Sequence, residues 1–77
     1  MKVTLFTKED CGLCREAEEM VLELQKNIRF DVDFVDISAD PVLYNRYRDR
    51  VPVVAVDGKE VAAAPLDGHR LKAILTS

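Results

Sequence analysis

The chain has 77 residues, which is the length of one small domain. Its apolar fraction of 48% is too high for a disordered chain, and its net charge of −3 gives no sign of nucleic-acid binding. It has no apolar run near the ~18 residues that a spanning helix needs, and no secretory signal at its start. We expect one domain over residues 1–77, located in the reducing cytoplasm, with no nucleic-acid or membrane partner.

The first half of the chain predicts a strand, a long helix and a second strand. Apolar residues from Val3 predict a strand over residues 2–6. From residue 12 to about 27, apolar residues recur at steps of three and four, which is typical of an amphipathic helix. This apolar stripe consists of Cys14, Ala17, Val21, Leu24 and Ile28. Asp10 is a candidate N-cap for the helix, and alternating Asp and apolar residues predict a strand over residues 30–36.

The second half predicts a short helix, a hairpin and a closing helix. Asp40-Pro41 is typical of a helix start, with Asp as the cap and Pro in the first turn, and this helix runs to about residue 47. Asp57-Gly58 is a strong signal for a tight hairpin turn. The remaining predicted elements are a strand over 51–56, a strand over 59–62, a loop over 65–68 and a closing helix supported by Leu66, Leu71, Ile74 and Leu75.

The predicted element order is β-α-β-α-β-β-α. A helix joins the first two strands, so these strands should be parallel with a right-handed connection. The last two strands should form an antiparallel hairpin. The fold class is therefore α/β, with a four-stranded mixed sheet and helices on both faces.

The segment Cys11-Gly12-Leu13-Cys14 lies between the first strand and the long helix, and it carries the clearest chemical signal. At a helix start, the first thiol meets unpaired backbone N–H groups and the positive end of the helix dipole. This environment favours the thiolate, which is the reactive form of cysteine. The carboxylates of Glu9 and Asp10 act in the opposite direction, by an amount that solvent screening keeps small. The sequence thus predicts a dithiol that cycles between reduced and oxidised states.

The element order, the Cys-x-x-Cys segment and Val51-Pro52 before the third strand together resemble the glutaredoxins, which have the thioredoxin fold. The resemblance covers nearly the whole chain, through residues 7–14, 50–54 and 57–59. It is nearest to the small glutaredoxin-like proteins of bacteria with a Cys-x-Leu-Cys site. The resemblance implies a thioredoxin fold and thiol–disulfide exchange.

Two departures from the glutaredoxin pattern concern the binding of glutathione. Dithiol glutaredoxins usually carry Cys-Pro-Tyr-Cys, whereas this chain has Gly12-Leu13 between its cysteines. Their glutathione site also uses a Gly-Gly pair and a following Asp, and the matching positions here are occupied by Ala62, Ala63, Ala64 and Pro65. Only Asp67 is available to replace the missing carboxylate. The resemblance therefore implies the fold and the exchange chemistry more directly than it implies glutathione binding.

The resemblance assigns a catalytic role to each cysteine. Cys11 is the candidate nucleophile, which attacks a substrate disulfide and forms a mixed disulfide. The alternative is an idle exposed cysteine or half of a metal site. Cys14 is the candidate resolving thiol, which attacks the mixed disulfide and releases the reduced substrate. Because Cys14 also lies on the apolar stripe, it would at the same time be a small buried hydrophobic residue.

Five further residues are candidates for substrate binding. Lys8 matches a family lysine that interacts with the thiolate or with the glutathione carboxylate, and the alternative is a solvated loop charge. Gly12 and Leu13 lie between the cysteines. Pro52 matches a cis proline of the family, which would free the Val51 backbone N–H and C=O to pair with an extended substrate chain. The alternative is an ordinary trans proline that enters an edge strand.

The function expected from these residues is that of a thiol–disulfide oxidoreductase. Its substrates would be protein disulfides or glutathione-mixed disulfides, and its electrons would come from glutathione or from a reductase partner. We expect a monomer with no bound metal and no resident cofactor. One alternative is a metal or iron–sulfur carrier, for which two cysteines supply only half of a tetrahedral site. Another is a peptide-binding module of the same fold, with the disulfide as a switch.

Overall fold

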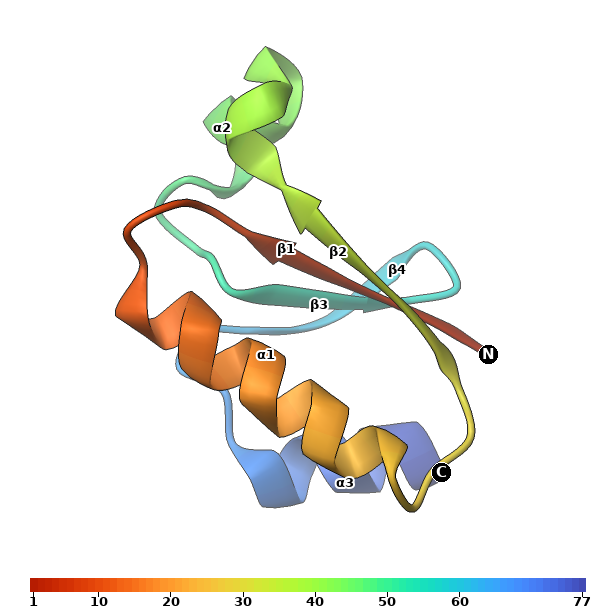
Figure 1. Cartoon of the computed structure of the whole chain (residues 1–77). Coiled ribbons are helices and arrows are strands. Elements are labelled where there is room, and N and C mark those ends of the chain that lie inside the picture. Colours follow the sequence, from red (N-terminus) through yellow and green to blue (C-terminus); the bar gives the residue numbers. More distant parts are fainter.

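The computed structural model describes all 77 residues, and its elements follow the predicted order (Figure 1). The strands are β1 (Lys2–Thr7), β2 (Asp31–Asp36), β3 (Val53–Val56) and β4 (Lys59–Ala63). The helices are α1 (Gly12–Gln25), α2 (Pro41–Tyr47) and α3 (Gly68–Thr76), with a 3-10 turn, η1, at Ile37–Ala39. None of these helices combines the length and the apolar character that crossing a membrane requires.

The four strands form one mixed sheet in the order β2-β1-β3-β4. β1 and β2 are parallel, because α1 carries the chain back to the start of the sheet. β3 runs antiparallel to both β1 and β4. Asp57 and Gly58 connect β3 to β4 with positive φ angles of 49° and 86°, the conformation that favours Asp-Gly in tight hairpins. The predicted α/β class and mixed sheet are confirmed.

Helices cover both faces of the sheet, as the sequence predicted. Figure 1 shows α1 and α3 on one side and α2 beyond the end of β2 on the other. The core between the sheet, α1 and α3 consists of Val3, Leu5, Ala17, Val21, Phe30, Val54, Leu71 and Leu75. A second cluster, which we call the cysteine cluster, consists of Cys14, Ile37, Tyr47, Val51 and Val53. The Tyr47 ring stacks on the Phe6 ring with their centroids 4.7 Å apart, so α2 is held on β1.

The structure corrects three details of the predicted elements. β3 begins at Val53 instead of Val51, because the Val51 N–H is donated to the Tyr47 carbonyl at the end of α2. The turn η1 was not predicted, and it forms where the Asp36 carboxylate accepts the Ser38 N–H at 2.8 Å. The β3–β4 pairing contains a bulge beside Val54 that was also not predicted.

Candidate functional site

Cys11 itself caps α1, so the prediction that Asp10 is the N-cap is wrong. Cys11 has extended backbone angles, and its Sγ accepts the backbone N–H of Cys14 at 3.2 Å. Asp10 lies one residue earlier, where its φ of 56° turns the chain into the helix. The sulfur therefore occupies the position where the first N–H groups of a helix lack partners. The half-buried Cys11 thiol receives a backbone hydrogen bond that stabilises negative charge on sulfur.

Cys14 is almost completely buried, with 2% of its surface exposed, in the cysteine cluster. Burial, together with the hydrogen bond and charge of Cys11, raises the pKa of the Cys14 thiol from its ordinary value of 9.0 to about 11. The backbone N–H and the ammonium of Lys8 lower this pKa by a smaller amount. Cys14 is therefore a protonated thiol near neutral pH. Both cysteines are free thiols in this structure.

The raised pKa of Cys14 predicts a loss of stability in alkali. A thiol with a higher pKa in the folded state stabilises the fold below the unfolded-state pKa, and this stability is lost as pH rises through about 11. Between pH 9 and pH 11, the wild type should lose on the order of 1–2 kcal/mol more unfolding free energy than Cys14→Ala. Urea unfolding of both proteins across this range measures the difference. Parallel pH profiles would contradict the expected loss.

Lys8 joins the β1–α1 loop to the end of α2. Its Nζ donates a hydrogen bond to the Arg48 carbonyl oxygen at 3.0 Å, and Arg48 is the residue that ends α2. Lys8 also lines the cavity above Cys11 and Cys14. The residue therefore has a structural contact in addition to its predicted place beside the thiols, and its role in substrate binding stays a prediction.

The cavity above the two cysteines is polar and rich in carboxylates. It has a volume of about 370 Å³. Its charged lining residues are Glu9, Asp10, Glu18 and Asp36, with Lys8 and Arg15 as the two cations. With four carboxylates and two cations, the ionised side chains around Cys11 carry net negative charge. Anionic substrates are disfavoured at this cavity, because like charges repel at short range.

The Val51–Pro52 peptide bond is cis, as the resemblance implied. Val51 is 8% exposed and Pro52 is fully buried. The predicted free N–H of Val51 is wrong, because this group donates to the Tyr47 carbonyl at 3.0 Å. The Val51 carbonyl oxygen has no intramolecular backbone partner and is the one backbone group of this residue left to pair with a substrate.

Gly12 and Leu13 lie on the surface beside Cys11. A Cβ added at Gly12 would meet no atom within 4 Å, so the space there is open. Leu13 is 55% exposed and lines an apolar cavity of about 100 Å³ together with Pro52, Pro65 and Leu66. Leu66 lies before α3 and not in the closing helix that it was expected to support. Sequence reasoning assigned neither Pro65 nor Leu66 to the site, although Pro65 is one of the positions that correspond to the glutathione site of glutaredoxins.

Comparisons with known proteins agree with this arrangement. The chain matches the glutaredoxin-like domain family (DUF836) over residues 2–76. The uncharacterized protein Rv0508 of Mycobacterium tuberculosis is 34% identical, and the alignment covers 94% of this chain and 79% of that protein. The X-ray structure of the X. campestris protein XcR50 is 36% identical with a TM-score of 0.74, covering 96% of this chain and 95% of the other.

A thioredoxin is also among the similar solved structures. A point mutant of thioredoxin from Halobacterium salinarum is 26% identical with a TM-score of 0.71, covering 96% of this chain and 70% of that chain. The matched family and these structures support a redox-type function for a chain with two cysteines at the start of α1. On its fold and on its match over residues 2–76, the chain belongs to the glutaredoxin-like domain family of the thioredoxin superfamily.

Proposed function

We propose that this protein is a thiol–disulfide oxidoreductase that uses Cys11 as its nucleophile and Cys14 as its resolving thiol. One observation carries the proposal: the half-buried Cys11 sulfur accepts a helix N–H at 3.2 Å, and the buried Cys14 follows one turn later. Cys11 is the sulfur that a substrate can reach, and burial keeps the Cys14 thiol protonated. A pair of unequal thiols in one helical turn suits two successive exchange reactions.

In the first reaction, the Cys11 thiolate attacks one sulfur of a substrate disulfide. A bond forms between Cys11 Sγ and that sulfur, the substrate S–S bond breaks, and the other substrate sulfur leaves as a thiolate. The Cys14 N–H donates to Cys11 Sγ. It therefore contacts the sulfur that loses its negative charge in this reaction and regains it when the disulfide is reduced. The product is a mixed disulfide between Cys11 and the substrate.

In the second reaction, Cys14 resolves the mixed disulfide. The hydrogen bond and charge of Cys11 contribute to the pKa of about 11 at Cys14, and they disappear when Cys11 is covalently bound. The pKa of Cys14 then falls, and Cys14 gives its proton to the substrate thiolate released in the first reaction. The Cys14 thiolate attacks Cys11 Sγ and forms the Cys11–Cys14 disulfide. The bond between Cys11 Sγ and the substrate sulfur breaks, and that sulfur leaves as a thiolate, which takes a proton from water. Two thiols from glutathione, or from a reductase, return two electrons and restore the reduced pair.

The substrates that we propose are disulfides of proteins, with glutathione as a reductant and a poorer ligand. The Asp67 carboxylate, which would replace the missing Asp of the glutathione site, accepts the backbone N–H of His69 at 2.9 Å. The carboxylates around Cys11 also disfavour the two carboxylates of glutathione. The Leu13 cavity offers an apolar contact that a protein side chain would fill. A reducing compartment such as the cytoplasm would keep the pair in its working range.

Trapping of the mixed disulfide tests this proposal. Cys14→Ser should accumulate a covalent adduct at Cys11 when it is mixed with a disulfide-containing protein such as insulin, because no thiol is left to resolve it. Intact-mass spectrometry should detect one adduct per chain, and dithiothreitol should release it. The wild type should show the intramolecular disulfide instead, which lowers its mass by two hydrogens.

The matched control is Cys11→Ser, in which the same chemical change is made at the other cysteine. It should form no adduct, because the remaining Cys14 thiol is buried away from the substrate. Equal adduct formation by the two variants would contradict the assigned roles. Absence of an adduct in both would favour the alternative of a peptide-binding module without exchange activity.

A further inference from the structure

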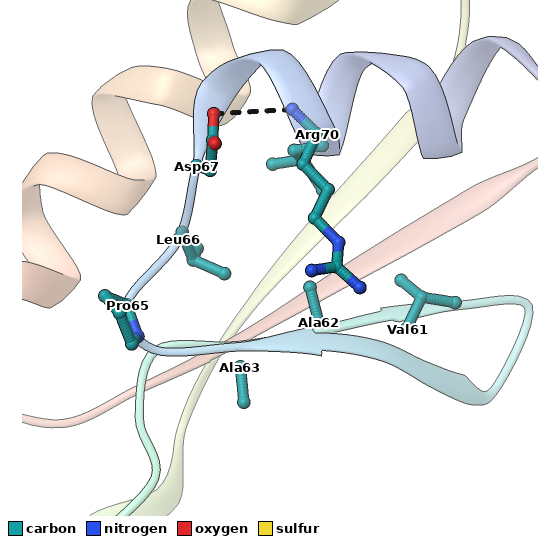
Figure 2. Close-up of a pocket in the computed structure, with 8 residues that line it drawn as sticks. Val61, Ala62, Ala63, Pro65, Leu66, Asp67 and Arg70 are labelled. Atoms are coloured by element: carbon teal, nitrogen blue, oxygen red, sulfur yellow. Dashed lines mark hydrogen bonds between the residues drawn. The ribbon is translucent and has the colours of Figure 1, made fainter.

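A cavity of about 240 Å³ lies between β4 and α3. Figure 2 shows Val61 and Ala62 directed from β4 toward the Arg70 side chain, whereas Ala63 points to the other face. Pro65, Leu66 and Leu71 complete the apolar lining. Asp67 is the one carboxylate of the lining, and its Oδ1 accepts the backbone N–H groups of His69 and Arg70 at the start of α3. Neither cysteine lines this cavity, so the two exchange reactions do not take place in it, although some of its lining residues lie at positions that correspond to the glutathione site of glutaredoxins.

The bulge in β4 creates the floor of this cavity. Val54 pairs with Ala62, and the next residue of β3, Ala55, pairs with Glu60, which leaves Val61 without a partner. In a regular strand, neighbouring side chains point to opposite faces, but an unpaired extra residue changes this alternation. Both Val61 and Ala62 consequently pack against the core on the α3 side. Two small side chains in succession leave a hollow where larger residues would fill the space.

An unpaired guanidinium lies over this hollow. The bond from Arg70 to Asp67 in Figure 2 is donated by the Arg70 backbone N–H, and the Arg70 side chain forms neither a hydrogen bond nor an ion pair. Lys59 forms no ion pair either. It pairs with Val56 of β3, so its side chain starts from the α3 face of β4. In a chain with a net charge of −3, this edge therefore presents two free cations.

The same edge offers unpaired backbone groups. β4 is the last strand of the sheet and has β3 as its single neighbour, so the outer row of its N–H and C=O groups has no strand partner. An added strand would satisfy these groups, and its side chains would alternate between the α3 face and the opposite face. A carboxylate on the α3 face would meet the guanidinium fork of Arg70, which suits two parallel hydrogen bonds.

We propose that the groove between β4 and α3 binds an extended acidic segment of a partner protein. The segment adds a strand to the outer edge of β4 and places one Asp or Glu side chain on Arg70. The volume of about 240 Å³ accommodates a single side chain, and the apolar floor contacts its methylene groups. This binding goes beyond the proposed exchange activity and requires neither cysteine.

Binding of short peptides to the reduced, full-length protein tests the proposal. The probe is a cysteine-free, acetylated and amidated hexapeptide of alternating Val and Thr with one central Glu, and the matched probe has Gln in its place. In ¹⁵N NMR titrations, the Glu peptide should shift the amides of residues 61–63 and the Arg70 Nε signal. It should bind about tenfold more tightly than the Gln peptide, because a charge-assisted pair is lost in the latter.

Variants on α3 identify the cation. Arg70→Gln should remove the preference for Glu over Gln, and Arg70→Lys, which keeps the charge, should restore part of it. Lys72→Gln is the matched control, because it removes the same charge from an exposed position of α3 that does not line the cavity. It should keep the preference. Cys11→Ser should bind like the wild type, which separates this test from that of the exchange activity.

Several results would overturn the proposal. Equal affinity for the Glu and Gln peptides would show that Arg70 does not bind a carboxylate there. If Arg70→Gln and Lys72→Gln lost the preference for the Glu peptide equally, the preference would come from the net charge of the protein and not from Arg70. Complete displacement of the Glu peptide by equimolar acetate, or binding only of a peptide with a free C-terminal carboxylate, would assign the site to another kind of ligand. Shifts confined to residues outside β4 and α3 would place the peptide elsewhere.

Discussion

Replacement of Cys11 by serine is expected to lower the rate of disulfide reduction by at least about 10³-fold. A hydroxyl is a far weaker nucleophile than a thiolate near neutral pH, and Cys14 cannot replace it because only 2% of its surface is exposed to a substrate. Serine is also a preferred N-cap residue, so its Oγ can accept the Cys14 N–H that Cys11 Sγ accepts in the wild type. The substitution therefore removes the chemistry and keeps the helix start.

A reduction assay with insulin and with a small mixed disulfide measures this effect. Thermal unfolding of the same samples is the control, and the melting temperature of Cys11→Ser should stay within a few degrees of the wild type. A rate within a few-fold of the wild type would contradict the assignment of Cys11 as the nucleophile. The alternative function, a peptide-binding module of the same fold, would then be favoured over the exchange activity.

Replacement of Ile37 by alanine should weaken both the fold and the environment of Cys14. Ile37 is fully buried in the cysteine cluster, and truncation of such a side chain costs about 2–5 kcal/mol of unfolding free energy. For a domain of this size, that is a large part of the total stability. The cavity would also admit water near Cys14, so its pKa should fall from about 11 toward its ordinary value of 9.0.

Ile37→Val is the matched control, because it removes one methylene group and should cost about 0.5–1.5 kcal/mol. Urea unfolding gives the stability of each variant. Thiolate absorbance in a Cys11→Ser background gives the pKa of Cys14, and the reference is the Cys11→Ser protein with Ile37 intact, because Cys11 itself contributes to the value of about 11. A Cys14 pKa that stays unchanged in a destabilised Ile37→Ala protein would contradict burial as its cause.

Local patterns were sufficient to predict most of the fold. The apolar stripe of residues 14–28 predicted the face of α1 that packs on the sheet, because one face of a helix repeats every three or four residues. The crossover helix required a parallel β1–β2 pair, and Asp57-Gly58 required a tight turn. These features depend on residues close together in the sequence.

The details that were missed depend on contacts between distant residues or on competition between neighbours. Asp10 and Cys11 are both able to cap a helix, and the positive φ of Asp10 decides for Cys11. The Val51 N–H is taken by the Tyr47 carbonyl, which was not foreseen because the exact end of α2 is not encoded in a short pattern. The bulge at Val61 arises from the pairing of β3 with β4 and has no sequence signal of its own.

The position of the candidate site in the fold could be predicted, but its surroundings could not. The cysteines adjoin a strand and a helix, so their place in the fold followed from the element order. The burial of Cys14 was expected from its position in the apolar stripe, whereas its neighbour Ile37 belongs to a turn that was not predicted. The unpaired Arg70 is on α3, far from the cysteines in sequence, and only the folded chain brings it to the edge of β4.

The redox titration of the Cys11–Cys14 pair in glutathione buffers tests the central claim most directly. Mass spectrometry after alkylation gives the fraction of oxidised pair at each ratio of reduced to oxidised glutathione. We predict a reversible two-electron transition with a midpoint between about −180 and −270 mV, the range of working exchange proteins. A midpoint well below about −300 mV, or failure to form the intramolecular disulfide, would contradict a pair that exchanges electrons with substrates.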